Sequence, residues 1–209
     1  MRKIYKYNKE LYTKDTPESM YFLGLVASDG CIDGYHVKIA LDKNDAKLLE
    51  ELRDSIVPGK PLYKSRETRV LKISCKPIMT FVKSSGITAR KSLNLKLEDW
   101  VLESKNFSHF LRGFFDGDGT VVTEKANGKP ASKIAVKICC GSKVLLEQLI
   151  CAASKYGLNK NKVYDERGYG VIKYTCGQSK KFYDLIYRDC GIKLDRKYDK
   201  FNQLLALLG

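Results

Sequence analysis

The sequence predicts an α+β fold in which two pseudo-symmetric αββαββα repeats pack through a central pair of parallel helices. Two apolar helical segments end in the same dipeptide, Asp29-Gly30 and Asp118-Gly119, and the two aspartates lie 118 − 29 = 89 residues apart. After each dipeptide, strand and helix patterns follow in the same order. We therefore expect one repeat over residues 1–95, a linker over 96–106 and a second repeat over 107–209.

The first repeat opens with a helix that starts at Thr16-Pro17 and continues into Gly30, because threonine can cap a helix and proline fits its first turn. Alternating apolar residues predict strands near residues 31–33, 35–41, 61–65 and 69–75. Apolar residues three or four positions apart predict helices near residues 44–56 and 76–85. These elements follow one another in the order αββαββα.

The second repeat has the same order. Its first helix should be buried, since apolar side chains recur at helical spacing at Phe107, Phe110, Leu111, Phe114 and Phe115. Strands are expected near residues 120–124, 133–140, 162–166 and 170–176, and helices near 142–156 and 179–189. The polar stretch 125–132, which contains Gly128 and Pro130, predicts a long hairpin loop.

The chain is strongly basic, with 38 Lys and Arg against 24 Asp and Glu, which gives a net charge of +14. This imbalance favours a polyanionic partner, because binding releases the counterions condensed on it. Nucleic acid is the leading candidate, although charge alone also fits a role in solubility or attraction to an anionic membrane surface. A chain of 209 residues can bury a full core without disulfides or metal.

The cysteines indicate a reducing compartment. They are odd in number, scattered and without the C-x-x-C spacing of zinc sites: Cys31, Cys75, Cys139, Cys140, Cys151, Cys176 and Cys190. No signal-peptide pattern is visible, and no apolar run approaches the ~20 residues that cross a bilayer. We expect a soluble intracellular protein, cytoplasmic or within an organelle.

Small residues lie four positions apart on one face of each repeated helix. They are Gly24 and Ser28 in the first helix, and Gly113 and Gly117 in the second. Small side chains allow two helix backbones to approach closely. We therefore expect the two helices to pack directly against each other at the centre of the molecule.

Asp29 and Asp118 stand at the negative end of a helix dipole, where an acid is unfavourable, although the glycine that follows each suits a left-handed helix cap. If the helices are parallel, two carboxylates and unpaired carbonyls meet and repel one another unless a hard cation lies among them. This pattern predicts a Mg²⁺ site, which Mn²⁺ would also fill, with Ala27, Ser28 and Gly117 as further candidate ligands. A single Asp-Gly pair is more simply a turn. Two pairs after matching helices favour the metal.

Two nine-residue segments, Phe22–Gly30 (FLGLVASDG) and Leu111–Gly119 (LRGFFDGDG), resemble the LAGLIDADG motif of homing endonucleases. Asp29 and Asp118 fall at the eighth position of the motif, which supplies the acidic metal ligand in that family. The resemblance implies a fold in which the antiparallel sheets form a DNA-binding saddle around the helix pair, and it covers nearly the whole chain beyond the first fifteen residues.

Other motif positions agree less uniformly. Gly24 and Gly113 fall on the glycine through which the family's helices pack. Asp116 matches an earlier acid of the motif, whereas Ala27 stands at that position in the first copy. This departure removes a supporting hydrogen bond from the first copy and leaves the metal ligand in place.

The resemblance implies an intron-homing type of enzyme that cleaves both strands of double-stranded DNA at a long asymmetric site by metal-dependent hydrolysis. It further implies that each aspartate anchors metal for one strand, that a lysine in each half supports the attacking water or the charge, and that cuts across the minor groove leave short 3′ extensions. Two unlike repeats in one chain imply a monomer that needs no protein partner.

Each half closes with Gly-Ile followed by a basic pair, and the second residue of each pair, Lys91 and Lys197, is our candidate for the catalytic lysine. A cation at a helix end or a phosphate contact would also account for these two residues. Lys38 and Lys137, on the first hairpin of each repeat, are the competing candidates.

The predicted strands alternate apolar and polar residues, so each sheet should turn one face to the helices and one to a ligand. Antiparallel ribbons of this kind fit the major groove, where Lys and Arg reach guanine edges or phosphates. The candidate DNA-binding residues are His36, Lys38, Lys64, Arg66, Arg69, Lys72, Lys133, Lys137, Arg167 and Lys173. One hairpin face is expected to bear Lys64, Arg66, Arg69 and Lys72. For any single strand, a solvated polar face explains the pattern equally well.

The two histidines share no motif position, so we expect His36 on a strand surface and His109 in the second repeated helix rather than general bases. Two other function classes stay open. A LAGLIDADG-fold protein can bind without cutting, as an RNA splicing maturase or a transcription regulator, and an unrelated basic module would lack the crossed helix pair. An intein is not expected, because no amino-terminal Cys or Ser and no terminal His-Asn pair is present.

Overall fold

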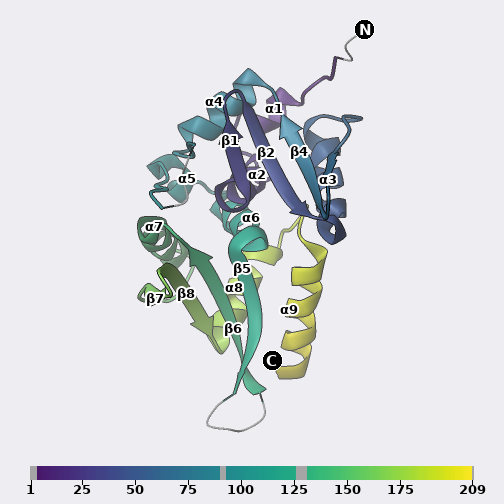
Figure 1. The fold of residues 1–209 in the computed structure, drawn as a ribbon. Helices are drawn as coiled ribbons and strands as arrows, with labels where there is room; N and C mark the ends of the chain where they lie inside the picture. Colours follow the sequence, from purple (N-terminus) through teal and green to yellow (C-terminus); the bar gives the residue numbers. More distant parts are fainter. Residues whose placement is uncertain (1–3, 90–92, 126–130, 209) are drawn as a thin grey trace.

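The computed structural model describes residues 4–89, 93–125 and 131–208 (Figure 1). Two four-stranded antiparallel sheets lie on either side of a central helix pair, α2 and α6 (Figure 1). The α+β class and the duplicated order of helices and strands are confirmed. No described helix has the length and apolar character needed to cross a membrane.

The first half forms the sheet β1-β2-β4-β3. Its elements are α1 (Lys9–Tyr12), α2 (Pro17–Ser28), β1 (Gly30–Asp33), β2 (His36–Asp42), the 3₁₀ turn η1 (Lys43–Asp45), α3 (Ala46–Ile56), β3 (Tyr63–Ser65), β4 (Thr68–Ile73) and α4 (Lys76–Ser84). The short helix α5 (Asp99–Glu103) lies within the expected linker.

The second half forms the sheet β5-β6-β8-β7, the same order as in the first half. Its elements are α6 (Phe107–Asp118), β5 (Gly119–Lys125), β6 (Ala131–Cys140), α7 (Lys143–Ser154), β7 (Tyr164–Glu166), β8 (Tyr169–Thr175), α8 (Gly177–Tyr187) and α9 (Asp195–Leu208). Helix α9 has no counterpart in the predicted order. Residues 126–130 of the expected hairpin loop lie outside the described residues.

Helices α2 and α6 touch through their glycines. A Cβ added at Gly24 would lie 2.0 Å from the carbonyl oxygen of Phe110, and one at Gly113 would lie 2.1 Å from the carbonyl oxygen of Tyr21. The two contacts are equivalent, since 110 − 21 and 113 − 24 both equal 89. The repeats are therefore related by an approximate twofold axis that passes between the helices.

The start of α2 follows the prediction. The hydroxyl of Thr16 accepts from the backbone N–H of Ser19 at 3.1 Å, and the hydroxyl of Ser19 accepts from the backbone N–H of Thr16 at 3.0 Å. This reciprocal cap leaves Pro17 as the first helical residue.

The glycines at the other end of each helix correct the prediction. Neither Gly30 nor Gly119 adopts the left-handed conformation expected of a helix cap, because each is the first residue of a strand. Space, rather than backbone conformation, requires glycine here. An added Cβ would lie 2.5 Å from Cα of Val26 at Gly30, and 2.1 Å from Cδ2 of Phe115 at Gly119.

Both sheets turn their apolar residues inward, as predicted. The buried side chains that follow this alternation on β2 and β6 include Val37, Ile39, Leu41, Ile134, Val136 and Ile138, whereas Ala135 of β6 is buried on the other face. The inward-facing residues and both central helices belong to one continuous hydrophobic core, so burial of apolar surface holds the two halves together.

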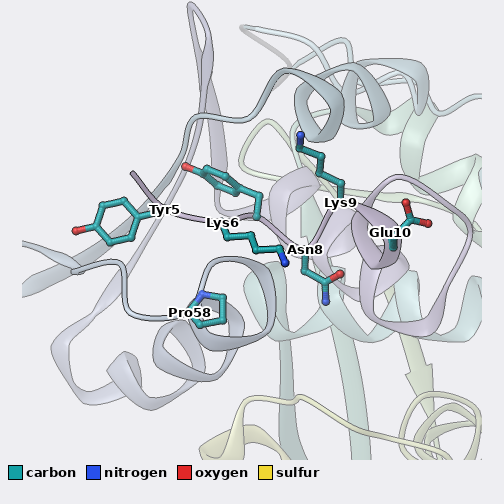
Figure 2. A pocket seen from close by; sticks show the side chains of 7 residues that line it. Tyr5, Lys6, Asn8, Lys9, Glu10 and Pro58 are labelled. Carbon is teal, nitrogen blue, oxygen red and sulfur yellow. The ribbon is translucent and has the colours of Figure 1, made fainter. Parts of the chain in front are cut away.

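The segment before α1 packs on the connection between α3 and β3. The backbone N–H of Asn8 donates to the carbonyl of Ile56 at 2.8 Å, and Lys60 Nζ donates to the Tyr7 hydroxyl at 2.8 Å. Figure 2 shows Tyr5 and Lys6 near Pro58, where the segment lines a cavity of about 890 Å³. None of the predicted site residues lines this cavity.

Candidate active site

The carboxyl ends of α2 and α6 lie together. A Cβ added at Gly117 would lie 2.0 Å from Ser28 Oγ and 2.8 Å from Asp29 Oδ2. Asp118 follows Gly117 directly, so the structure brings the two motif aspartates to one place. Residue numbers rise in the same direction along both helices from the glycine contacts to this point, so the helices are parallel, as expected.

Asp118 opens onto a cavity of about 400 Å³ between the helix ends and the second sheet. Its lining residues are Ala27, Ser28, Leu95, Asp118, Cys139, Cys140, Gly141 and Tyr169. Cys139 and Tyr169 were not among the predicted site residues. Burial raises the pKa of the Cys139 thiol, and Glu166 and Asp118 raise it further. The thiol is therefore protonated at neutral pH and a poor ligand or nucleophile.

Lys197, in the first turn of α9, contacts the carboxyl end of α6. Its Nζ donates to the carbonyl oxygens of Phe115 and Gly117, both at 2.9 Å, and its residue is 7% exposed. Burial lowers the pKa of Lys197 to about 8, against the opposing attraction of nearby carboxylates that include Asp29 and Asp118. The lysine thus supplies positive charge to the negative end of α6 within electrostatic reach of both motif aspartates.

The depressed pKa of Lys197 predicts how stability depends on pH. Between pH 8 and 10.5 the lysine is neutral in the folded protein but protonated in the unfolded chain. The free energy of unfolding therefore rises with pH through this window, because the folded protein no longer has to bury a charged ammonium. Lys197→Met should therefore increase the free energy of unfolding relative to the parent at pH 7, on the order of 2 kcal/mol, and raise the melting temperature, with a smaller increase at pH 10. Melting curves at the two pH values measure this, with Lys200→Met, an exposed change on the same helix, as the control. A difference from the parent that is equal at both pH values would contradict it.

The other candidate lysines are placed differently. Lys91 lies outside the described residues. Lys38 and Lys137 lie on the outward faces of β2 and β6, and Lys38 pairs with Asp33 while Lys137 Nζ is 4.0 Å from Glu166. Of the three candidates among the described residues, Lys197 is the one whose contacts place it at the helix ends.

Asp116 is an internal acceptor rather than part of the aspartate pair. It is 2% exposed and accepts hydrogen bonds from the hydroxyls of Tyr21 at 2.8 Å and Tyr187 at 3.2 Å and from the backbone N–H of Leu194 at 2.9 Å. Burial raises the pKa of Asp116 to about 6, although these hydrogen bonds oppose the shift. Ala27, at the corresponding position of α2, has no side chain that could make such contacts. The supporting hydrogen bonds are therefore confined to one of the two helices.

Arg112 was also not among the predicted site residues. Its side chain connects α6 to the end of α8 and to the segment that follows it. It is 2% exposed and donates to the carbonyls of Ile192 at 3.1 Å and Ile186 at 3.2 Å, with its guanidinium 4.9 Å from the Tyr21 ring centre. His109 Nδ1 lies 2.8 Å from Arg112 Nη1, and burial, followed by the arginine charge, lowers the pKa of His109. His109 is thus packed in α6, as expected. The sequence offered one sign of this buried role, which is an arginine at position 112 within the mainly apolar helix α6.

The outward faces of the sheets carry matched pairs of lysines. Lys38 pairs in register with Lys72 across β2 and β4, and Lys137 with Lys173 across β6 and β8. Acids also lie on this surface, since Lys173 Nζ is 2.6 Å from Glu124. A polyanion bound here would have to displace such acids from the lysines.

The hairpin β3-β4 does not present its four basic residues on one face, so that prediction was wrong. Lys64 pairs in register with Arg69, which lies an odd number of residues from Lys72 and therefore on the opposite face. Arg66 lies in the turn with φ 49°, and Arg167 occupies the corresponding turn of the second half with φ 55°. Lys72 instead lies on the same face as Lys38, its register partner on β2.

The remaining predicted contact residues lie on strands. His36 begins β2, and its Nδ1 lies 2.8 Å from Ser74 Oγ. Lys133 is exposed on β6 and pairs in register with Glu124 of β5. Both positions are on the outward faces of the sheets, as expected from strand alternation.

The donors at the helix ends suit a hard divalent cation. Within the described residues, no three His, Cys, Asp or Glu side chains cluster to hold a metal. Mg²⁺ does not need such a cluster, because it commonly takes one or two carboxylates and completes its shell with water and substrate phosphates. Asp29 and Asp118 provide two carboxylates at the helix ends, and Asp118 lines the cavity of about 400 Å³. The hydroxyl of Ser28 turns back to the carbonyl of Gly24 at 3.2 Å, and the carbonyl of Gly117 accepts from Lys197.

Comparison with known proteins supports the same architecture. Residues 108–190 match the family model of the LAGLIDADG-like domain. Nearly the whole chain superposes on the homing endonuclease I-WcaI bound to its DNA recognition sequence, with a TM-score of 0.66 and 14% identity over 91% of this chain and 89% of that one. The chain has the LAGLIDADG fold. The first motif, in α2, lies before residues 108–190 and is not part of the match to the family model. It packs against the matched region because α2 pairs with α6.

Two further solved structures have the same fold as this chain. I-AabMI bound to uncleaved DNA gives a TM-score of 0.63 at 12% identity, over 92% of this chain and 90% of that one. I-SmaMI bound to uncleaved DNA with calcium ions gives 0.59 at 15% identity, over 93% and 92% of the two chains. A curated relative, the replication factor C small subunit of Methanocaldococcus jannaschii, is 23% identical over 95% of this chain. The chain spans 10% of the length of that protein.

Proposed function

We propose that this LAGLIDADG protein is a site-specific, metal-dependent DNA endonuclease that cleaves both strands of a long asymmetric target. The observation that carries the proposal is the meeting of Asp29 and Asp118 at the end of a buried parallel helix pair, with Lys197 beside them. Two sheets with outward lysines flank this point. The structural neighbours named above include the homing endonuclease I-WcaI and the LAGLIDADG meganuclease I-AabMI, both in complexes with DNA.

Each residue of the site has a task in phosphodiester hydrolysis. Asp29 and Asp118 would hold divalent cations, which activate water and stabilise the charge that builds on the phosphate and the leaving oxygen. Lys197, with a pKa near 8, can carry a positive charge or release a proton close to neutral pH. Its two carbonyl contacts hold the ammonium in place at the end of α6, so it can support a phosphate or a water without reorganising.

The two sheets would read two unlike half-sites. Because both sheets belong to one chain and carry different side chains, a monomer should bind a target without palindromic symmetry. The outward lysines Lys38, Lys72, Lys137 and Lys173 would contact phosphates or guanine edges. Such an enzyme acts where duplex DNA is found, inside a cell or an organelle.

DNA affinity should fall steeply with salt, since a net charge of +14 places several basic residues on phosphates. Lys133→Gln and Lys173→Gln should each reduce the slope of log affinity against log salt by at most about one unit. Lys180→Gln, on α8 and away from the sheet faces, is the matched control and should leave the slope unchanged. Affinity that stays flat between low and physiological salt would rule out the electrostatic contribution.

Selection of cleaved sequences from a randomised or genomic DNA library in Mg²⁺ tests the proposed activity. We expect one long, asymmetric sequence to be enriched, with both strands cut a few base pairs apart. Enrichment of a palindrome, with two chains required for each cut, would contradict the monomeric reading. Binding to DNA or RNA without cleavage would favour a splicing or regulatory protein with the same fold.

A further inference from the structure

Asp45, at the end of η1 in the first repeat, is joined to the start of α9 in the second repeat. Its two carboxylate oxygens accept hydrogen bonds from Arg196 Nε at 2.9 and 3.0 Å. The Asp45 residue is 7% exposed, so its carboxylate depends on this partner more than a surface carboxylate would. The two residues lie 151 positions apart in the sequence.

The first turn of α9 and the residue before it are held at three points. The backbone N–H of Leu194 donates to Asp116 at 2.9 Å, Arg196 bonds to Asp45, and Lys197 Nζ donates to the carbonyls at the end of α6. The backbone N–H of Lys197 also donates to the carbonyl of Leu194 at 3.0 Å, which closes the turn. Neighbouring residues of a helix project in fixed relative directions. Fixing Arg196 on the first repeat therefore fixes the direction in which Lys197 leaves α9.

We propose that Asp45, acting through Arg196, is a positioning residue that aims Lys197 at the carboxyl end of α6. The first repeat then sets a side chain in the part of the active site that belongs to the second repeat. The consequence for cleavage rests on the function proposed above, whereas the placement of Lys197 can be measured without it.

A neighbouring ion pair provides the matched control. Lys47 Nζ lies 2.5 Å from Asp195, so this pair also joins the first repeat to the start of α9. Its side chains are 70% and 44% exposed, and exposed pairs contribute little to stability. Lys47→Ala therefore removes a cross-repeat ion pair without touching Arg196 or Lys197.

The placement of Lys197 is tested in the full-length chain by limited labelling with a lysine-reactive reagent, followed by mass spectrometry. The parent and Lys47→Ala should keep Lys197 protected relative to exposed lysines such as Lys200. Asp45→Ala should label Lys197 several-fold faster. Exchange of the pair, Asp45→Arg with Arg196→Asp, should restore protection, which a variant that merely unfolds would not do. Unchanged labelling of Lys197 in Asp45→Ala overturns the proposal, whatever the cleavage result.

The catalytic consequence is tested by single-turnover cleavage. Asp45→Ala should lower the rate constant roughly tenfold or more, because a displaced catalytic side chain is costly, while DNA affinity stays near the parent's. The charge exchange should recover part of the rate. An equal loss of rate and affinity that the exchange does not reverse counts against positioning. If the parent itself does not cut DNA, the proposed function fails, and the labelling result still decides the role of Asp45.

Discussion

Asp29→Asn and Asp118→Asn are each expected to abolish double-strand cleavage while leaving DNA binding nearly intact. The amide keeps the size of the side chain but removes the charge that holds a hard cation. We expect cleavage in Mg²⁺ to fall by about a thousandfold or more, because charge stabilisation of the transition state is lost. DNA affinity, measured in Ca²⁺, should change little since the outward sheet faces are untouched.

Melting temperature separates this result from simple unfolding. Each change relieves repulsion between two acids at the negative ends of helices but also weakens the attraction of Lys197. The two effects oppose each other, so stability should stay within roughly 0.5 kcal/mol of the parent's. Asp184→Asn on α8, where the acid pairs with Lys180 at 3.2 Å, is a matched control that should retain cleavage. Near-parental cutting of both strands by either motif variant would show that the metal centre lies elsewhere.

Gly113→Ala is expected to have the largest effect on stability. Its Cβ would lie 2.1 Å from the carbonyl oxygen of Tyr21 and 2.9 Å from the backbone nitrogen of Leu25, and neither backbone atom can move aside independently. Helices α2 and α6 would have to separate, at a cost of about 3 kcal/mol or more. For a chain of this size the melting temperature should fall by roughly 6 °C or more. Gly24→Ala should behave in the same way.

Gly177→Ala is the control for this experiment. No atom lies within 4 Å of the Cβ it would add in α8, so alanine should be neutral or stabilise by about 0.4–1 kcal/mol. A Gly113→Ala variant that melts with the parent would show that the helices do not approach as closely as the structure indicates. Cleavage should be lost together with stability in Gly113→Ala, because separation of the helices moves Asp29 away from Asp118.

The architecture was predictable where local patterns decide it. Alternation indicated which side of β2 and β6 is buried, and Thr16 followed by Pro17 marked the start of α2. The duplication supported these assignments, because the same order of helices and strands was predicted independently in both halves of the chain. The pairing of α2 with α6 followed because small residues recur at matching positions of two otherwise bulky apolar helices.

The errors arose where neighbouring elements, rather than local sequence, decide the conformation. Gly30 and Gly119 looked like helix caps, but each strand starts immediately and the glycine is needed for space. Basic residues of β3-β4 were grouped by composition, although strand alternation alone places Arg69 and Lys72 on opposite faces.

The remaining gaps concern contacts between distant segments. Asp45 and Arg196 are 151 residues apart, and no local pattern signals that they meet. Nor does the sequence around Lys197 show that it is buried beneath α6. Its position after Gly-Ile suggested a role, but the contacts with Phe115 and Gly117 depend on how α9, an unexpected helix, returns to the core.

We propose that Asp29 and Asp118 hold divalent cations between the ends of α2 and α6. Iron-mediated cleavage of the protein locates such an ion. In the complex with the selected DNA target, Fe²⁺ replaces Mg²⁺, ascorbate and peroxide generate hydroxyl radicals at the bound ion, and mass spectrometry locates the backbone cuts. We expect cuts concentrated around residues 27–30 and 116–119 that disappear in the double variant Asp29→Asn with Asp118→Asn. Cuts centred on other segments, or cuts that persist in the double variant, would contradict it.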